Sequence, residues 1–362
     1  MSEVDLQIDA LQRIAAERDD VLALGGGLPA SELFPRAELE SAFAESLAVR
    51  GDPALQYGWP EGTPGLRAWI AARLRARGAV VDDADVLITS GAQQAIAIAA
   101  EILLHDGDSV AVDAETYPAA LDVFRGRGAV AKEMPWGADV VRYVMPGVSN
   151  PRGVDLSPEA RRALLASSAP FIADEAYTDL CFGDVSRPLL ADARDRAWHV
   201  GTFSKTLAPG LRIGYLVTPP AAHARALELK HATDLQAPSV GQALLEAFLA
   251  KDDFDARLTR ARAFYRDRAT RFAEALRRSL PSARFVEPTG GFSIFVETDA
   301  RGDDTAFLRL ATAEGVSFDP GSMFRPASVD RPLSLRLCYS ATSPDAYDEA
   351  MRRLARALAK WS

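Results

Sequence analysis

The chain has 362 residues, of which 48% are hydrophobic, so it is long enough for two packed domains and too apolar for a disordered protein. A formal net charge of −9 argues against binding to nucleic acid or to an anionic membrane. The two cysteines lack CxxC spacing, which favours buried reduced thiols, and the four scattered histidines predict no metal site.

The N-terminal segment lacks the basic and apolar regions of a signal peptide, and the most apolar run, 95–104, is too short to span a bilayer. We therefore expect a soluble cytoplasmic protein. Helical spacing predicts an N-terminal arm helix over 6–18, followed by a short strand at 21–24 and a loop rich in glycine and proline. Two more helices are expected at 36–48 and 66–77.

From residue 86 onward, short apolar strands alternate with helices. The expected strands are 86–89, 109–113, 142–145, 171–174, 198–201 and 212–217, and the helices among them are 92–104, 117–127 and 158–166. This alternation predicts an α/β fold with a mainly parallel sheet covered by helices on both faces. Ligands of such sheets bind beyond the carboxyl ends of the strands, which is where the polar motifs of this chain fall.

Beyond residue 235 the pattern changes to one long helical stretch, 240–280, followed by shorter elements. The expected strands there are 284–286, 291–297, 316–319 and 333–339, and the helices are 306–313 and 344–361. This order is typical of a smaller α+β domain. We therefore divide the chain into an arm with part of the small domain (1–44), a large domain (45–236) and a C-terminal small domain (237–362).

The segment Gly201–Tyr215, GTFSKTLAPGLRIGY, carries the most informative pattern. Only five of the 41 basic residues of the chain are lysine, and one of them, Lys205, lies here between small hydroxyl residues. A lysine that condenses with an aldehyde cofactor needs such a partly desolvated setting. Thr202, Ser204 and Arg212 would supply hydroxyl donors and a forked cation to a phosphate ester. Pyridoxal 5′-phosphate (PLP) carries both groups; the alternative is a surface turn with an incidental lysine.

Three further motifs lie at strand ends. Gly91 joins a strand to a helix, where exposed N–H groups can bind an anion, although an ordinary helix cap would have the same sequence. Asn150 is held at the edge of the sheet by the proline that follows it. Asp174 ends an apolar strand, and a carboxylate in such surroundings needs a cation. The protonated pyridine nitrogen of PLP is one such cation.

Arg336 alternates with apolar residues on a strand, in LRL. An arginine that points inward needs a carboxylate partner. The α-carboxylate of an amino acid would provide bidentate pairing, and an internal Asp or Glu is the alternative.

Together, the order and spacing of Asn150, Asp174 and Lys205 resemble the fold-type I PLP-dependent enzymes. More narrowly, the chain resembles the class I and II aminotransferases of the 2-aminoadipate and kynurenine aminotransferase group. The resemblance runs from Leu24 to the terminal helix through the segments GGGLPASELFP, LQYGWPEGTPGLR, ITSGAQQAI, SNPRG, ADEAYTDLCFG, GTFSKTLAPGLRIGY, HATDLQAP and LRLCYS. It implies a fold-type I PLP-dependent transferase that moves an amino group between an L-amino acid and a 2-oxo acid by a ping-pong mechanism.

The resemblance also implies residue roles. Lys205 would bind the cofactor covalently and move a proton at the substrate's Cα, Asp174 would pair with the pyridine nitrogen, and Tyr117 would stack on the ring. The implied cofactor-binding residues are Gly91, Ala92, Gln93, Tyr117, Asn150, Asp174, Tyr177, Thr202, Ser204, Lys205, Arg212 and Tyr57. The implied substrate-binding residues are Gly26, Gly27, Asn150 and Arg336. Because Tyr57 would reach the phosphate in the neighbouring subunit, a homodimer is implied.

The chain departs from the family pattern at several places. Ala92 replaces a phosphate-binding serine, and Arg152 replaces a threonine and would add a cation near the mouth of the site. The arm near Ala10 lacks the arginine that relatives with acidic substrates use, so specificity for 2-aminoadipate is in doubt. The candidate residues for the side-chain pocket are Leu28, Trp59, Phe292, Met323, Phe324 and Arg325.

Two other functions remain open. The same cofactor site would serve a PLP-dependent cyclase, decarboxylase or oxidase that acts on a specialised amino acid, since the protein mainly directs which bond to Cα breaks. Some transcription regulators carry a related ligand-sensing domain; that function would need a basic winged-helix segment, whereas the residues before the first motif are acidic.

Overall fold

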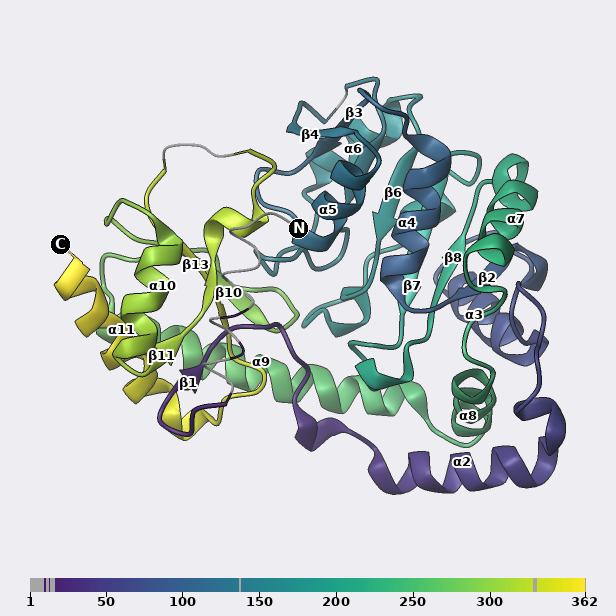
Figure 1. The fold of residues 1–362 in the computed structure, drawn as a ribbon, viewed down its shortest axis with the longest axis horizontal. Helices are drawn as coiled ribbons and strands as arrows, with labels where there is room; N and C mark the ends of the chain where they lie inside the picture. Colours follow the sequence, from purple (N-terminus) through teal and green to yellow (C-terminus); the bar gives the residue numbers. More distant parts are fainter. Residues whose placement is uncertain (1–9, 11–12, 14–16, 137, 328–330, 362) are drawn as a thin grey trace.

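A computed structural model describes residue 10, residue 13 and residues 17–136, 138–327 and 331–361 (Figure 1). Most of the arm helix expected at 6–18 lies outside these residues. Within the described ranges, no helix has both the length and the apolar character needed to cross a membrane. Both cysteines, Cys181 and Cys338, are buried free thiols, as expected.

The larger of the sheets has seven strands in the order β2-β8-β7-β6-β5-β3-β4. The strands are β2 (Val86–Thr89), β3 (Ser109–Val112), β4 (Val130–Glu133), β5 (Arg142–Val144), β6 (Phe171–Asp174), β7 (Ala197–Thr202) and β8 (Gly214–Val217). Only β8 runs antiparallel to its neighbours β2 and β7, and the other pairs are parallel. The mainly parallel sheet expected from the sequence is therefore confirmed.

Helices cover both faces of this sheet because successive side chains of its strands point to opposite sides. In β2, Val86 and Ile88 belong to the same buried cluster as residues of α3, α6 and α8, whereas Leu87 belongs to a cluster with residues of α4, α5 and α7. The helices are α3 (Pro64–Ala76), α4 (Ala92–Leu103), α5 (Pro118–Gly126), α6 (Pro158–Ala166), α7 (His223–Asp234) and α8 (Ser239–Leu249). Most of the sheet is thus buried between two layers of helices.

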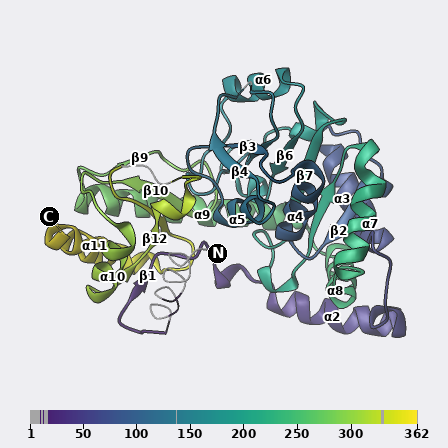
Figure 2. The ribbon, with the colours of Figure 1, turned by 45° about the horizontal axis from the view of Figure 1, so that its top comes forward.

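A second body lies beside the large sheet (Figures 1 and 2). Its four-stranded sheet has the order β12-β13-β10-β9, and a two-stranded parallel sheet, β1-β11, ties the N-terminal segment to it. The strands are β1 (Leu22–Ala23), β9 (Arg284–Phe285), β10 (Ser293–Glu297), β11 (Val316–Ser317), β12 (Asp319–Pro320) and β13 (Ser334–Cys338). The helices are α9 (Phe254–Ser279), α10 (Asp304–Ala313) and α11 (Tyr347–Trp361), which share one buried core with these strands.

Four elements differ from the sequence-based expectation. The long helix expected at 240–280 is two helices, because Asp253 caps a new helix, α9, by accepting a hydrogen bond from the Ala256 N–H. The expected strand 316–319 is divided between β11 and β12 of two sheets. Strand β4 and helix α7 were not expected: β4 is largely exposed, and α7 is mostly polar, so neither has a clear apolar pattern.

Helix α2 (Arg36–Arg50) packs against α8. Ala42 of α2 and Leu245 of α8 both belong to the buried cluster under the large sheet. The chain then crosses to the second body along α9, the long green helix in Figure 1. The sequence-based limits of the domains stay a prediction.

Candidate active site

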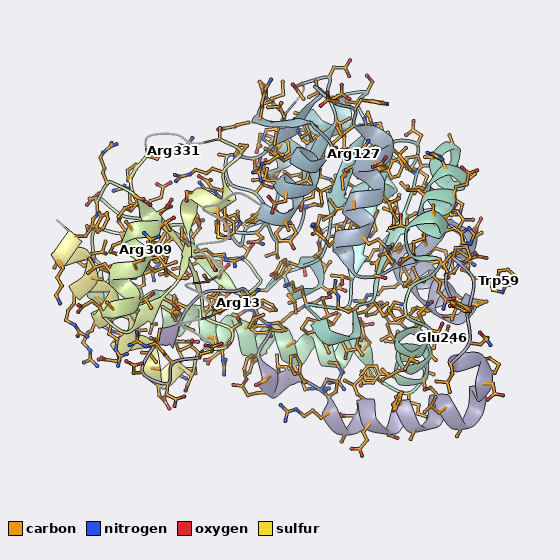
Figure 3. The ribbon with its side chains drawn as sticks, viewed as in Figure 1. Arg13, Trp59, Arg127, Glu246, Arg309 and Arg331 are labelled. Carbon is orange, nitrogen blue, oxygen red and sulfur yellow. The ribbon has the colours of Figure 1, made fainter. Side chains whose placement is uncertain are left out.

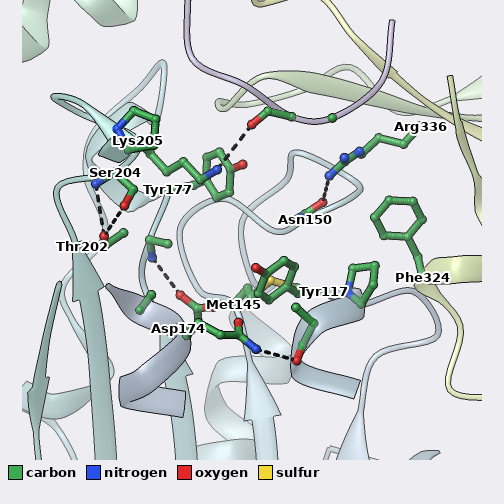
Figure 4. A pocket seen from close by; sticks show the side chains of 18 of the residues that line it. Tyr117, Met145, Asn150, Asp174, Tyr177, Thr202, Ser204, Lys205, Phe324 and Arg336 are labelled. Atoms are coloured by element: carbon green, nitrogen blue, oxygen red, sulfur yellow. Dashed lines mark hydrogen bonds between the residues drawn. The ribbon is translucent and has the colours of Figure 1, made fainter. Parts of the chain in front are cut away.

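A cavity of about 420 Å³ lies at the carboxyl ends of the large sheet's strands, where they meet the second body (Figure 4). Of the residues given a cofactor-binding or substrate-binding role from the sequence, those that line it are Gly26, Gly27, Ala92, Gln93, Tyr117, Asn150, Asp174, Tyr177, Thr202, Ser204, Lys205, Arg212 and Arg336. Asp174 ends β6 and Thr202 ends β7, while Arg336 comes from β13 of the other body. The strand-end motifs therefore meet in one space.

Lys205 lies in the turn after β7, between the buried residues Phe203 and Leu207. Its Nζ lies 3.4 Å from the carbonyl oxygen of Gly27 and donates to it. The same Nζ lies 5.2 Å from the centroid of the Tyr177 ring. The amine is thus held at the junction of the two bodies with an aromatic ring beside it.

Asp174 is buried at the floor of the cavity. Its Oδ2 accepts a hydrogen bond from the Tyr143 hydroxyl at 2.7 Å, and its Oδ1 accepts one from the Ala176 N–H at 3.1 Å. Burial raises the pKa of Asp174, and these two hydrogen bonds oppose that rise. A buried carboxylate held in this way is a site for a cation. Tyr143 was not predicted as a site residue, since its only signal in the sequence is a polar residue within the buried strand next to that of Asp174.

At one end of the cavity the donors suit an anion. The Thr202 Oγ1 donates to the Ser204 Oγ at 3.0 Å, and Arg212 has a left-handed backbone (φ 53°) that brings its Nη2 to 3.2 Å from the Ser90 carbonyl oxygen. Helix α4 begins at Ala92, and its N-cap, Gly91, has no side chain to satisfy the first N–H groups. Two hydroxyls, a guanidinium and an uncapped helix N-terminus therefore converge here, which is the donor set that a phosphate prefers.

The close packing in this cradle requires glycine. Gly91 has a φ of +85°, and a Cβ there would come 2.6 Å from the Arg212 Nη2. A Cβ on Gly214 would come 2.6 Å from the Gly91 carbonyl carbon. Gly91 itself does not line the cavity, but it sets the distance between Arg212 and the start of α4.

Arg336 is buried in the opposite wall, on β13. Its Nε and Nη2 donate to the Asp319 Oδ2 at 2.8 and 2.6 Å, and its Nη1 donates to the Asn150 Oδ1 at 2.8 Å. Burial lowers the pKa of Arg336, but the charge of Asp319 outweighs this and raises it, so the guanidinium stays charged. The internal acidic partner that the sequence left open is thus Asp319, which had not been named in advance, and Arg336 still lines the cavity.

The remaining candidates lie in different surroundings. Tyr117 precedes α5 and lines the cavity, and burial raises its pKa to about 12. Met323 and Phe324 line it as well. Tyr57 and Trp59, in contrast, are 78% and 75% exposed, and Trp59 projects from the edge of the molecule in Figure 3.

Arg152 and Arg325 belong to a cluster of charges between the two bodies. Glu115, whose side chain is fully buried, accepts hydrogen bonds from the Arg152 Nε at 2.8 Å and Nη2 at 2.5 Å. The Arg325 Nε lies 3.8 Å and the Arg331 Nη1 3.3 Å from the other oxygen of Glu115. The structure thus places Arg325 against Glu115 rather than in the cavity wall.

Comparison with known proteins assigns the family. Residues 20–354 match the sequence model described as aminotransferase class I and II. The chain belongs to this family. It is 33% identical to a 2-aminoadipate transaminase of Thermus thermophilus over 94% of this chain and 91% of that protein. Helix-turn-helix transcriptional regulators also match much of the chain.

Solved structures agree with this assignment. The α-aminoadipate aminotransferase of Thermus thermophilus, complexed with N-(5′-phosphopyridoxyl)-L-leucine, superimposes with a TM-score of 0.87 at 31% identity, over 100% of this chain and 97% of that chain. The kynurenine aminotransferase of Pyrococcus horikoshii superimposes with a TM-score of 0.90 at 28% identity, over 99% and 97% of the two chains. The resemblance to this group and the fold-type I architecture are therefore confirmed.

This protein is therefore an aminotransferase, an enzyme with PLP as its cofactor and with amino acids and 2-oxo acids as its substrates. The polar groups of the cavity fit this cofactor: the cradle at α4 suits its phosphate, Asp174 suits its pyridine nitrogen, and Lys205 suits its aldehyde. Among the described residues, no group of three or more His, Cys, Asp and Glu side chains is arranged to hold a metal ion.

Proposed function

We propose that the protein transfers an amino group between an L-amino acid and a 2-oxo acid in this cavity. Lys205 is the residue that binds PLP covalently and moves a proton at the substrate's Cα. The observation that carries this proposal is the position of the Lys205 Nζ, which lies in one cavity with Asp174, the phosphate-type cradle and Arg336. Bound PLP supplies a ring that accepts electrons from the bonds at Cα. An amine held beside such a ring acts as the acid and base at that carbon.

The other site residues have distinct roles in this proposal. Asp174 pairs with the pyridine nitrogen, Tyr117 stacks on the ring, and Asn150 and Tyr177 hold its phenolic oxygen. The residues that hold the phosphate are Gly91, Ala92, Gln93, Thr202, Ser204 and Arg212. Gly26, Gly27, Asn150 and Arg336 bind the α-carboxylate of the substrate. The convergence of all but Gly91 on one cavity supports these roles.

The amino-acid substrates that fit this cavity best carry neutral, apolar or aromatic side chains. Three apolar residues, Met145, Met323 and Phe324, form part of the cavity wall. Arg152 and Arg325 do not line the cavity but face Glu115, so their charge is directed at a group of the protein. A second carboxylate on the substrate would have to compete with that buried anion.

The functional unit in this proposal is a homodimer, in which Tyr57 reaches the phosphate of the neighbouring site. Leu55, Tyr57 and Trp59 are 68%, 78% and 75% exposed. The Ser239 hydroxyl donates to the Gln56 carbonyl oxygen at 3.1 Å, and this contact joins the loop to the segment that carries Leu235, which is 51% exposed. Apolar side chains gathered in this way are typical of a surface covered by another protein chain.

Two free cysteines and the acidic net charge support a cytoplasmic location. We place the large domain at 45–236 and the C-terminal small domain at 237–362, with the arm and part of the small domain at 1–44. Helix α9 begins in the buried cluster of the large sheet and continues into the core of the second body. Helix α8 then belongs to the small domain by sequence but packs on the large one.

The test is single-turnover chemistry on the PLP-loaded protein. An amino acid alone should bleach the absorbance of the bound cofactor and release one equivalent of its 2-oxo acid per site. Lys205→Ala should lose at least about a thousandfold in turnover, while Lys251→Ala, at an exposed lysine, should not change it. Release of carbon dioxide, hydrogen peroxide or a cyclised product in place of the 2-oxo acid would support a decarboxylase, an oxidase or a cyclase instead.

A further inference from the structure

A carboxylate of the protein lies against the arginine that is proposed to bind the substrate's carboxylate. Asp319 of β12 is directly opposite Arg336 of β13 in the register of the sheet. Asp319 is 1% exposed and lines the cavity. Its Oδ2 accepts from both the Nε and the Nη2 of Arg336.

The hydrogen-bond donors of Arg336 can be counted. A guanidinium has five N–H groups in a fixed plane. Asp319 takes the Nε–H and one N–H of Nη2, and Asn150 takes one N–H of Nη1. One N–H remains on each terminal nitrogen, which is the number that a single carboxylate accepts in bidentate pairing.

Asp319 also fixes the loop on the other side of the arginine. The Gly26 N–H lies 3.0 Å from each of the two Asp319 oxygens. At the next residue, Gly27, a Cβ would come within 3.3 Å of both the Nη1 and the Nη2 of Arg336, and the Gly27 carbonyl accepts from Lys205. One buried carboxylate therefore sets the position of Arg336 relative to the loop that reaches the catalytic lysine.

The charge of Asp319 has a second consequence. The negative charge of Asp319 largely balances the positive charge of Arg336. Attraction for a substrate carboxylate therefore has to come from the direction of the two remaining N–H groups rather than from net charge. An arginine without this partner would be free to rotate about its side-chain bonds, and this freedom would be lost on binding.

We propose that Asp319 is a positioning residue that orients Arg336, so that one N–H on each terminal nitrogen is presented to the α-carboxylate of every donor and acceptor. This inference rests on the proposed role of Arg336. It makes carboxylate recognition independent of the side chain of the substrate.

The test measures binding of unreactive carboxylates to the PLP-loaded enzyme. Propionate and 3-phenylpropionate carry the carboxylate but no amino group, and calorimetry gives their dissociation constants directly. Asp319→Asn keeps the shape of the side chain but puts an NH₂ group where Gly26 or Arg336 donates, so both constants should rise by the same factor, at least about tenfold. Binding of 3-phenylpropionamide, which has no carboxylate, should stay unchanged.

Asp303→Asn is the matched control. Asp303 caps α10 in the same body and is exposed, and Asn caps a helix about as well as Asp, so this substitution should change neither the stability nor the binding of either acid. Tighter binding of the acids to Asp319→Asn would show that Asp319 only neutralises Arg336. Equal weakening of the acid and the amide would show that it only supports the fold. Either result would overturn the proposal, as would unchanged binding.

If Asp319→Asn does not fold or does not hold PLP, Arg336→Lys decides. An ammonium can still pair with Asp319 but has no planar pair of N–H groups, so the same loss specific to the acids is expected, and unchanged acid binding would overturn the proposal. Transamination is measured separately. The unaltered enzyme could fail to transfer an amino group while its binding of the acids still depends on Asp319. This result would reject the proposed function and leave the inference about Asp319 standing.

Discussion

The Tyr143 hydroxyl donates a hydrogen bond to the Asp174 Oδ2 at 2.7 Å, between two side chains that are both buried. Tyr143 lies on β5 and Asp174 on the adjacent parallel strand, β6. With the other oxygen held by the Ala176 N–H, the carboxylate is oriented by the protein itself. This bond stabilises the ionised form of a group whose pKa burial raises.

Tyr143→Phe should therefore lower activity most at acidic pH. Loss of the hydrogen bond raises the pKa of Asp174 further, so the acid limb of the kcat/KM profile should move to higher pH, and kcat/KM at neutral pH should fall about tenfold. The substitution keeps the ring, which packs on Phe124 at 5.6 Å between centroids. A pH–rate profile measures the shift, and an unchanged acid limb would show that Tyr143 does not act on Asp174.

The sequence predicted those parts of the structure in which local pattern and tertiary packing agree. The limits of β2, α6 and β6 match the predicted ones because each has a clear apolar run or proline start. Strand β4 and helix α7 were missed because they are stabilised by neighbours rather than by an apolar pattern of their own.

The site shows the same division. Lys205, Asp174 and Arg212 lie in motifs that can be read locally, and all three line the cavity. Tyr143 and Asp319 could not be found in this way, since each acts on a residue of a neighbouring strand, and the register of the strands decides which side chains meet.

Gly91→Ala should weaken PLP binding by an order of magnitude or more. The new Cβ would lie 2.6 Å from the Arg212 Nη2 and push the guanidinium away from the start of α4. Gly107→Ala is the matched control, because Gly107 has a similar φ of +82° but no atom within 4 Å of an added Cβ. Both variants should lose about 1 kcal/mol of stability from backbone strain. Titration of the apoprotein with PLP should separate them, and equal PLP affinities would contradict the cradle.

Glu175→Gln should destabilise the protein at neutral pH by about 3 kcal/mol. Burial raises the pKa of Glu175, but the effect of His199 and Arg77 is larger and lowers this pKa to about 2. The Arg77 Nη2 lies 2.7 Å from the carboxylate. Because the folded-state pKa is below the unfolded one, this stability is present above about pH 4.5 and is lost as the pH falls toward 2. Urea unfolding at pH 7 and pH 4 measures the free energy of unfolding of the unaltered protein and of Glu175→Gln. If the difference between the two proteins does not become smaller at pH 4, the role given to Glu175 is contradicted.

Glu115→Gln should loosen the contact between the two bodies. The substitution leaves Arg152, Arg325 and Arg331 without their shared buried anion, at a cost of about 3 kcal/mol. The Thr116 N–H donates to the Phe324 carbonyl at 2.7 Å, so Phe324 in the cavity wall should shift and KM should rise. Glu133→Gln is the control, because this exposed residue lies 3.7 Å from Arg331 and should contribute less than about 1 kcal/mol. Thermal unfolding and steady-state kinetics would show whether the two variants differ.

The last prediction concerns the second subunit. If a partner chain covers the loop at Tyr57, then Leu55→Asp combined with Leu235→Asp should produce a monomer, because charged side chains would be placed in an apolar contact. The monomer should also bind PLP at least about tenfold more weakly, since the hydroxyl of the partner subunit's Tyr57 no longer reaches the phosphate.

Two controls separate these effects. Val80→Asp changes an 81% exposed side chain outside this loop and should leave both the dimer and PLP affinity unchanged. Tyr57→Phe removes only the hydroxyl, so it should weaken PLP binding while the protein stays dimeric. Sedimentation at assay concentration, together with PLP titration, reads out both properties. An unaltered protein that sediments as a monomer and is fully active would reject the composite site, because the exposed Tyr57 would then have no phosphate within reach.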